Sequence, residues 1–142
     1  MSEGIESVTA VDVAPASNAI TDRTRNGSVA LTAGQSVYVD ASDEWALADA
    51  DAAGTAGDTA GEIGVTLSEC NAGQPIAVQT GGDLDPGFTP TVGSMYALAG
   101  DTAGGILELS TLDSGAYVTL LGVGTTTTNL HLLIYPTEKV KP

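Results

Sequence analysis

The stretch "AYVTLLGVGTTTTNLHLLIY", residues 116–135, indicates the fold class of this chain most directly. Two runs rich in apolar and β-branched residues, 116–123 and 129–135, flank a segment of Gly, Thr and Asn. In the second run the apolar residues alternate around His131, as expected for a strand that buries one face. The stretch therefore predicts two β-strands separated by a turn.

The same kind of pattern recurs along the rest of the chain. Strand-like runs separated by Gly-, Asp- and Asn-rich turns lie at 27–32, 36–40, 62–68, 75–80, 94–99 and 105–110. The segment "SDEWALADADAAG" (42–54) starts with a plausible helix cap, but its Asp-Ala pairs give no lasting helical stripe, so we interpret 44–48 as a strand. Short strands at this spacing predict an all-β domain, a small barrel or sandwich of jelly-roll-like form.

Charge limits the possible partners of the chain. Its 142 residues, enough for one domain, carry a net charge of −14, and the four basic residues are Arg23, Arg25, Lys139 and Lys141. Because the body between them has no cation to neutralise phosphate, we expect neither nucleic acid nor an anionic membrane as a partner. A solvated, self-repelling surface is the simpler interpretation of the acidity, and orientation of a partner is the other.

Composition divides the chain into three parts. Residues 1–27 hold a possible strand followed by polar, turn-prone sequence, so we expect an extended N-terminal arm that lies across a neighbour. Residues 28–136 form the β domain. Residues 137–142 form a short basic tail, because the prolines after Tyr135 are expected to end the sheet. The single cysteine, Cys70, and the absence of a secretory pattern at the N-terminus favour the cytoplasm as the place of synthesis.

One segment occurs twice. "AGDTAGEI" (56–63) and "AGDTAGGI" (99–106) contain no base, no aromatic residue and a turn at the middle. We interpret both as loops of a weakly repeated β unit, and chance similarity of turn composition is the alternative.

Few residues suggest chemistry. His131 lies in an alternating strand and is expected to line a face, and it has no second His or Cys pair with which to bind zinc. Aspartates gather in 49–58 and at 83–85, but neither stretch has the spacing of a calcium loop, so solvated loop aspartates are expected. We predict no catalytic residue, no cofactor and no metal.

The body of the chain resembles the small head decoration (cement) proteins of tailed bacteriophages. The resemblance spans most of residues 28–135 and follows the rhythm "iGV…aGq…V…G", carried by Ile63, Gly64, Val65, Ala72, Gly73, Gln74, Val78 and Gly81. It implies a non-enzymatic homotrimer on the outer capsid surface of the virion. There it would bridge subunits of the major capsid protein and stabilise the mature head.

The resemblance also implies that an N-terminal arm contacts the shell or an adjacent trimer. The candidate contact residues are the apolar and basic side chains of the arm: Ile5, Val8, Val11, Arg23 and Arg25. The leading alternative is another virion β module, a head-fibre base or a tail-fibre or baseplate domain, with or without glycan binding. An accessory module of a carbohydrate-active enzyme and an enzyme in its own right are further alternatives.

Overall fold

The computed structural model describes residues 3–51 and 62–142 and confirms an all-β fold. The strands are β1 (Ala14–Pro15), β2 (Ile20–Asp22), β3 (Ser36–Val39), β4 (Trp45–Leu47), β5 (Ile63–Thr66), β6 (Val78–Asp85), β7 (Met95–Leu98), β8 (Ile106–Glu108), β9 (Tyr117–Gly124) and β10 (Leu130–Val140). Two short 3₁₀ helices, η1 (Ala10–Asp12) and η2 (Leu109–Thr111), complete the elements. No helix in these two ranges is long and apolar enough to cross a membrane.

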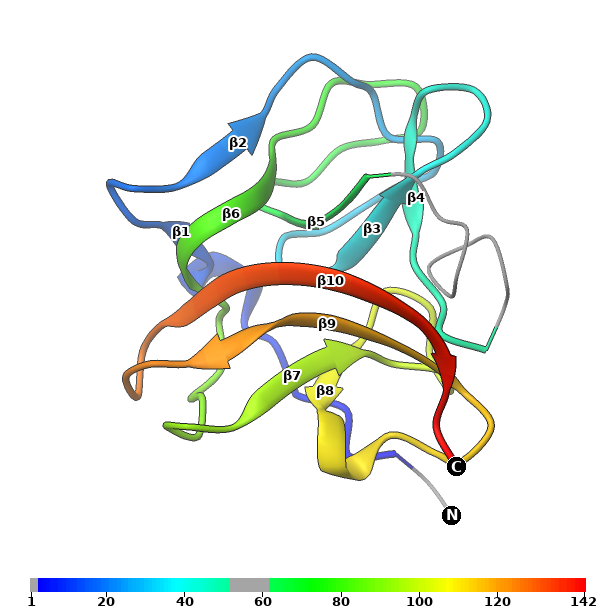
Figure 1. Ribbon diagram of the computed structural model, residues 1–142. Helices are drawn as coiled ribbons and strands as arrows, with labels where there is room; N and C mark the ends of the chain where they lie inside the picture. The colour runs from blue at the N-terminus through cyan, green and yellow to red at the C-terminus, as the bar shows by residue number, and fades with distance from the viewer. Residues whose placement is uncertain (1–2, 52–61) are drawn as a thin grey trace.

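All ladders between the named strands are antiparallel and join into one curled sheet (Figure 1). The strand order is β4-β3-β5-β6-β10-β9-β7-β8, and β1 and β2 pair with β6 from the N-terminal segment. The first half of β6 pairs with β5 and β2, and its second half pairs with β10 and β1. The strand β6 therefore connects the two halves of a half-barrel. The smaller apolar cluster includes Val37 of β3, Trp45 of β4 and Val78 of β6. The larger cluster combines residues of β7, β8, β9 and β10 with Ile63 and Val65 of β5.

The strands β9 and β10 confirm the prediction for residues 116–135. They pair in register from Leu130 opposite Gly124 to Val140 opposite Tyr117, with bulges on the way. Leu130 and Leu132 are buried in the larger core cluster, whereas Leu133 and Tyr135 point to the other face and are exposed. Alternation along β10 thus separates a core face from a solvent face, as period-two patterning requires.

The prediction for β6 is wrong at both ends. A strand was expected at 75–80, followed by the Gly- and Asp-rich turn sequence TGGDLDPGFTP (80–90), but the strand begins at Val78 and continues through both glycines to Asp85. Gly82 has φ +80°, and a Cβ there would lie 2.3 Å from the carbonyl oxygen of Asn18. The glycines therefore let the strand bend beneath the N-terminal segment without ending it. Gln79 bridges the bend by donating to the carbonyls of Gly81 and Asp83.

The segment predicted as a strand at 27–32 does not form a regular strand. The isolated β-bridges within it and directly before it go to three different partners: Asn26 pairs with Pro75, Gly27 with Trp45, and Leu31 with Cys70. No single neighbour continues for more than one residue, so no ladder forms. The segment still closes the smaller core, where Leu31, Trp45 and the buried thiol of Cys70 pack together.

The C-terminal residues extend the sheet, contrary to the expectation that prolines end it after Tyr135. The strand β10 includes Pro136 opposite Thr119 and runs to Val140. Pro136 is tolerated because β6 pairs with β10 only at 130–132, which leaves this part of β10 with one paired neighbour. The ammonium of Lys141 then donates to the carbonyls of Leu109, Ser110 and Leu112 around η2.

The N-terminal segment lies against the domain of its own chain. Ile5 forms a bridge with Leu107, Thr9 donates its amide to Gly87, and β1 and β2 add to β6. Residues 3–26 therefore contribute to the sheet and the core in addition to any contact with a neighbour.

The two copies of the repeated segment differ in what can be described. The second copy, 99–106, leads from β7 into β8 as a tight turn, in agreement with the loop prediction. Most of the first copy, 56–63, lies outside the described residues.

Candidate binding surfaces and charged clusters

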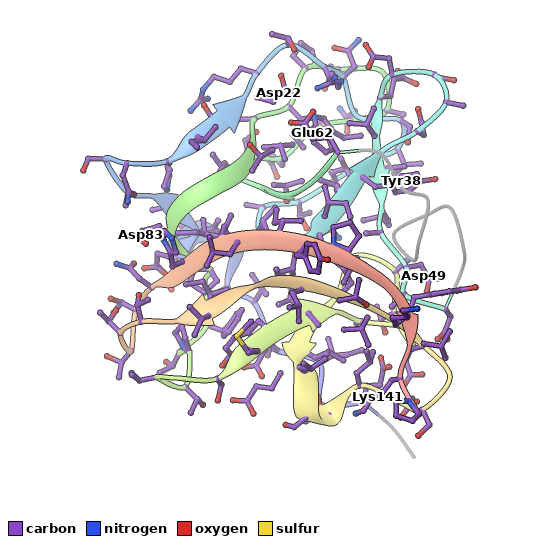
Figure 2. All side chains as sticks on the ribbon, in the orientation of Figure 1. Asp22, Tyr38, Asp49, Glu62, Asp83 and Lys141 are labelled. Atoms are coloured by element: carbon purple, nitrogen blue, oxygen red, sulfur yellow. The ribbon has the colours of Figure 1, made fainter. Side chains whose placement is uncertain are left out.

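His131 binds an acid of the neighbouring strand. Its Nδ1 lies 2.8 Å from Oδ1 of Asp83, which stands opposite it in the β6–β10 register. Asn18 donates to the other oxygen of Asp83 at 3.2 Å and accepts the Asp83 amide at 2.9 Å. Figure 2 shows Asp83 at the end of β10 where β6 passes it. The three side chains tie the β1–β2 turn to the point where the two sheet halves meet.

Arg25 holds the other half of the sheet together through three acids. Its guanidinium lies 2.9 Å from Asp43, 3.1 Å from Asp22 and 3.2 Å from Glu62, and 5.7 Å from the ring centroid of Trp45. Figure 2 places Asp22 and Glu62 together on this side of the molecule. The hydrogen bond to Asp43 and that to Asp22 raise the pKa of Arg25 further above its already high value.

Asp22 is the second centre of this network. Burial alone would raise its pKa, but hydrogen bonds from Thr24, Trp45 and Arg25 outweigh burial and lower the pKa. The indole of Trp45 donates to Asp22 at 2.9 Å, so the one tryptophan has its polar atom satisfied inside the smaller core.

Glu3, near the N-terminus, makes four hydrogen bonds, three of them through its buried carboxylate and one through its own amide. Glu3 is only 9% exposed, and its oxygens accept the amides of Gly100 and Asp101, both at 2.8 Å, and of Asp113 at 3.1 Å. Its own amide donates to Asp101 at 3.1 Å. Glu3 thereby pins the start of the chain to the two loops that follow β7 and η2.

Carboxylates crowd around this anchor. Oxygens of Glu3, Asp101 and Asp113 lie within 4.8 Å of one another, a set of hard oxygen ligands that could hold a divalent cation. No local sequence pattern predicts this cluster, because Asp101 and Asp113 lie 98 and 110 residues from Glu3. Of the aspartates considered for calcium, Asp83 binds His131, Asp85 accepts the amide of Gly87, and Asp58 lies outside the described residues.

The crowding predicts how acidity affects stability. Burial and then the negative charges of neighbouring carboxylates raise the pKa of Asp51 and of Asp113. A carboxyl with a raised pKa binds its proton more tightly in the folded state, so its unfavourable contribution is present at pH 7 and is lost as pH falls through the folded pKa. We expect the melting temperature of Asp51→Asn to match or exceed that of the unsubstituted protein at pH 7. As pH falls from 7 to about 4, the ordinary pKa of an aspartate, the melting temperature of the unsubstituted protein should rise relative to that of Asp51→Asn.

Thermal melts over this pH range check the prediction, with Glu69→Gln as the control. Glu69 is an exposed acid, and it is not one of the carboxylates that raise the pKa of Asp51. Its removal should therefore leave the dependence of melting temperature on pH unchanged. Equal slopes for all three proteins would contradict the contribution assigned to Asp51.

The five candidate contact residues of the arm fall into two groups. Ile5 packs on the larger core, Val8 packs beside Gly34 and Gly87, and Arg25 is held by its three acids. Val11 is 88% exposed and Arg23 is also exposed. Only these two of the five are positioned to contact a partner without rearrangement of the domain.

A second exposed apolar set lies on the outer face of three adjacent strands. Register places Met95 opposite Val123, Val123 opposite His131, and Leu120 opposite Tyr135. Directly opposite residues project to the same side of a sheet. We name the surface formed by these five residues and Leu133 the β7–β9–β10 face; Leu133 is 59% and Tyr135 63% exposed.

The β7–β9–β10 face differs from the rest of the chain in charge. Its six residues come from two segments, 86–100 and 114–137, that contain no Asp, Glu, Lys or Arg, although the chain has 18 acids. The acids next to it are satisfied at its rims, Asp83 by His131 and Glu108 by the hydroxyl of Tyr96 at 3.3 Å. The sequence contained this signal as two uncharged segments, but their adjacency depends on the strand order.

Two of the grooves on the described surface differ in polarity. One, of about 490 Å³, is polar and is lined among others by Ser7, Thr9, Asp12, Asp85, Phe88 and Thr127. The other, of about 340 Å³, lies where β10 and the β5–β6 pair diverge and is lined by Glu62, Ile63, Thr80, Ile134 and Pro136.

Comparison with known proteins identifies no relative. No protein-family model, no curated protein and no solved structure matches the chain.

Proposed function

We propose that this protein is a non-enzymatic capsid decoration protein that binds the outside of a mature phage head as a homotrimer and stabilises it by bridging major capsid subunits. The observation that carries the proposal is the exposed apolar side chains in a chain of net charge −14: Val11 on the N-terminal segment, and Leu133 and Tyr135 on β10. Contiguous exposed apolar groups, such as Leu133 and Tyr135 on one face of β10, mark protein–protein contact sites. The sequence resemblance supplies the kind of partner.

The physical properties of the domain suit this role. A curled sheet of antiparallel ladders around two cores gives a rigid body. Its acidity keeps free copies soluble and limits stacking away from the shell. Many copies that each make a modest contact hold a shell by avidity.

The N-terminal segment is the part proposed to contact the shell. Deletion of residues 1–26 would also remove β1, β2 and the Arg25 network, so loss of binding would not separate contact from folding. Point substitutions at Val11 and Arg23 avoid this difficulty because both side chains are exposed.

We expect Val11→Glu and Arg23→Glu each to reduce co-sedimentation with empty mature shells by about tenfold, since each places charge against the proposed contact. The substitution Val29→Glu, at a 43% exposed position next to the smaller core, is the control and should bind normally. Unchanged melting temperatures show that the domain is intact. Full binding by both variants would remove the N-terminal segment from the contact.

One observation favours the rival function of a glycan-binding virion module. The polar groove combines the hydroxyls of Ser7, Thr9 and Thr127, the carboxylate of Asp12 and the ring of Phe88, which suits a neutral, polyhydroxylated ligand. Glycan-array binding that Asp12→Asn abolishes, together with no affinity for shells, would favour the rival.

A further inference from the structure

We infer that the β7–β9–β10 face is the surface through which copies of this chain associate with one another. The inference rests on the proposed function, which requires an oligomer but does not say which surface forms it. The face is defined by the register of β7, β9 and β10 and by the outward alternation of His131, Leu133 and Tyr135 on β10.

Apolar exposure is the first reason. Leu133 and Tyr135 project from the solvent side of β10, while Leu130 and Leu132 on the opposite side are buried. Met95 and Val123 continue the apolar row across the two neighbouring strands. Covering such a row removes apolar area from water, which is the main favourable contribution to association.

Charge is the second reason and selects the occupant. Two copies that each carry −14 repel one another wherever acids face acids. A partner with a basic surface would bind best to the acidic parts of this molecule, whereas a second copy requires contact surfaces free of acid on both sides. The β7–β9–β10 face is built from segments without Asp or Glu, and the adjacent Asp83 and Glu108 are engaged within their own chain.

Geometry allows the face to serve a closed oligomer. Around a rotation axis every copy turns the same face toward the axis, so three uncharged faces can meet while the acidic surfaces point outward. The end of β10 supplies the one exposed cation of this region, Lys139.

Two readouts of oligomeric state test the inference. The mass in solution, from light scattering and sedimentation, is expected to be three times 14.1 kDa for the unsubstituted protein, as the proposed homotrimer requires. Added NaCl should strengthen association, because it screens repulsion between like net charges while the apolar contact itself is not screened. A contact between charged surfaces would instead weaken.

Leu133→Glu and Tyr135→Glu are expected to weaken association by at least about tenfold, because each buries an acid against an apolar surface. The control Val29→Glu adds the same charge on the other sheet half and should leave the mass unchanged. Circular dichroism and melting temperature verify that the variants fold. A monomer at all salt and protein concentrations, or variants that keep the full mass, would overturn the inference.

Shell co-sedimentation separates this inference from the proposed function. Variants that keep their mass but lose shell binding would overturn the inference and assign the face to the capsid, with the decoration function upheld. Variants that become monomers support the inference, and absence of shell binding by the intact oligomer would then refute the decoration function alone.

Discussion

Gly82→Ala is expected to destabilise the domain by about 3 kcal/mol, the sum of a left-handed backbone penalty and a steric clash. Gly82 has φ +80°, and its added Cβ would lie 2.3 Å from the carbonyl oxygen of Asn18 and 2.9 Å from the Cα of Ala19. Both contacts are backbone atoms, so no side chain can rotate away. The strand β6 would have to separate from the β1–β2 turn at the point where it joins the two sheet halves.

Gly93→Ala is the matched control for this substitution. Gly93 has a similar φ of +86° but no heavy atom within 4 Å of an added Cβ, so its substitution measures the backbone penalty alone, about 1–2 kcal/mol. Chemical denaturation of both variants gives the two free energies of unfolding. Equal losses for Gly82→Ala and Gly93→Ala would show that β6 does not approach Asn18 this closely.

Glu3→Ala is expected to cost about 2–3 kcal/mol, chiefly by leaving three amides without their acceptor. The amides of Gly100, Asp101 and Asp113 each donate to Glu3, and hydrogen bonds to a charged acceptor are the stronger kind. Relief of repulsion from Asp101 and Asp113 offsets part of this loss, because oxygens of the three carboxylates lie within 4.8 Å. We expect the hydrogen bonds to dominate, since Glu3 is almost fully buried.

Glu3→Gln separates the two contributions. The amide keeps one acceptor oxygen and removes the negative charge, so its loss of stability should be smaller than that of Glu3→Ala. Hydrogen exchange at the amides of Gly100, Asp101 and Asp113 is the direct readout, with faster exchange expected in the order unsubstituted, Gln, Ala. Unchanged exchange in Glu3→Ala would contradict the anchoring role of this residue.

Local sequence patterns predicted several strands correctly, either by alternation of apolar residues or by β-type content. The alternation of 129–135 identified β10, and the β-type content of 36–40, 44–48 and 94–99 identified β3, β4 and β7. These signals are local, because a period of two reflects one strand and the core beneath it. The all-β class therefore followed from the sequence.

The failures arose where a distant partner determines the backbone. Gly81 and Gly82 were interpreted as part of a turn, but pairing of Gly81 with β2 and of Gly82 with β10 continues the strand through them. Pro136 was expected to end the sheet, but it lies where β10 has one paired neighbour. The Glu3 cluster and the β7–β9–β10 face both depend on the strand order, which no local pattern encodes.

The proposed decoration of phage heads can be tested most directly by adding the purified protein to empty mature phage shells, and measuring bound copies and the temperature at which the shells disrupt. We expect binding that saturates at a fixed ratio to the major capsid protein and a higher disruption temperature for decorated shells. Shells that bind no protein, or that bind it and disrupt at an unchanged temperature, would contradict a stabilising role on the capsid.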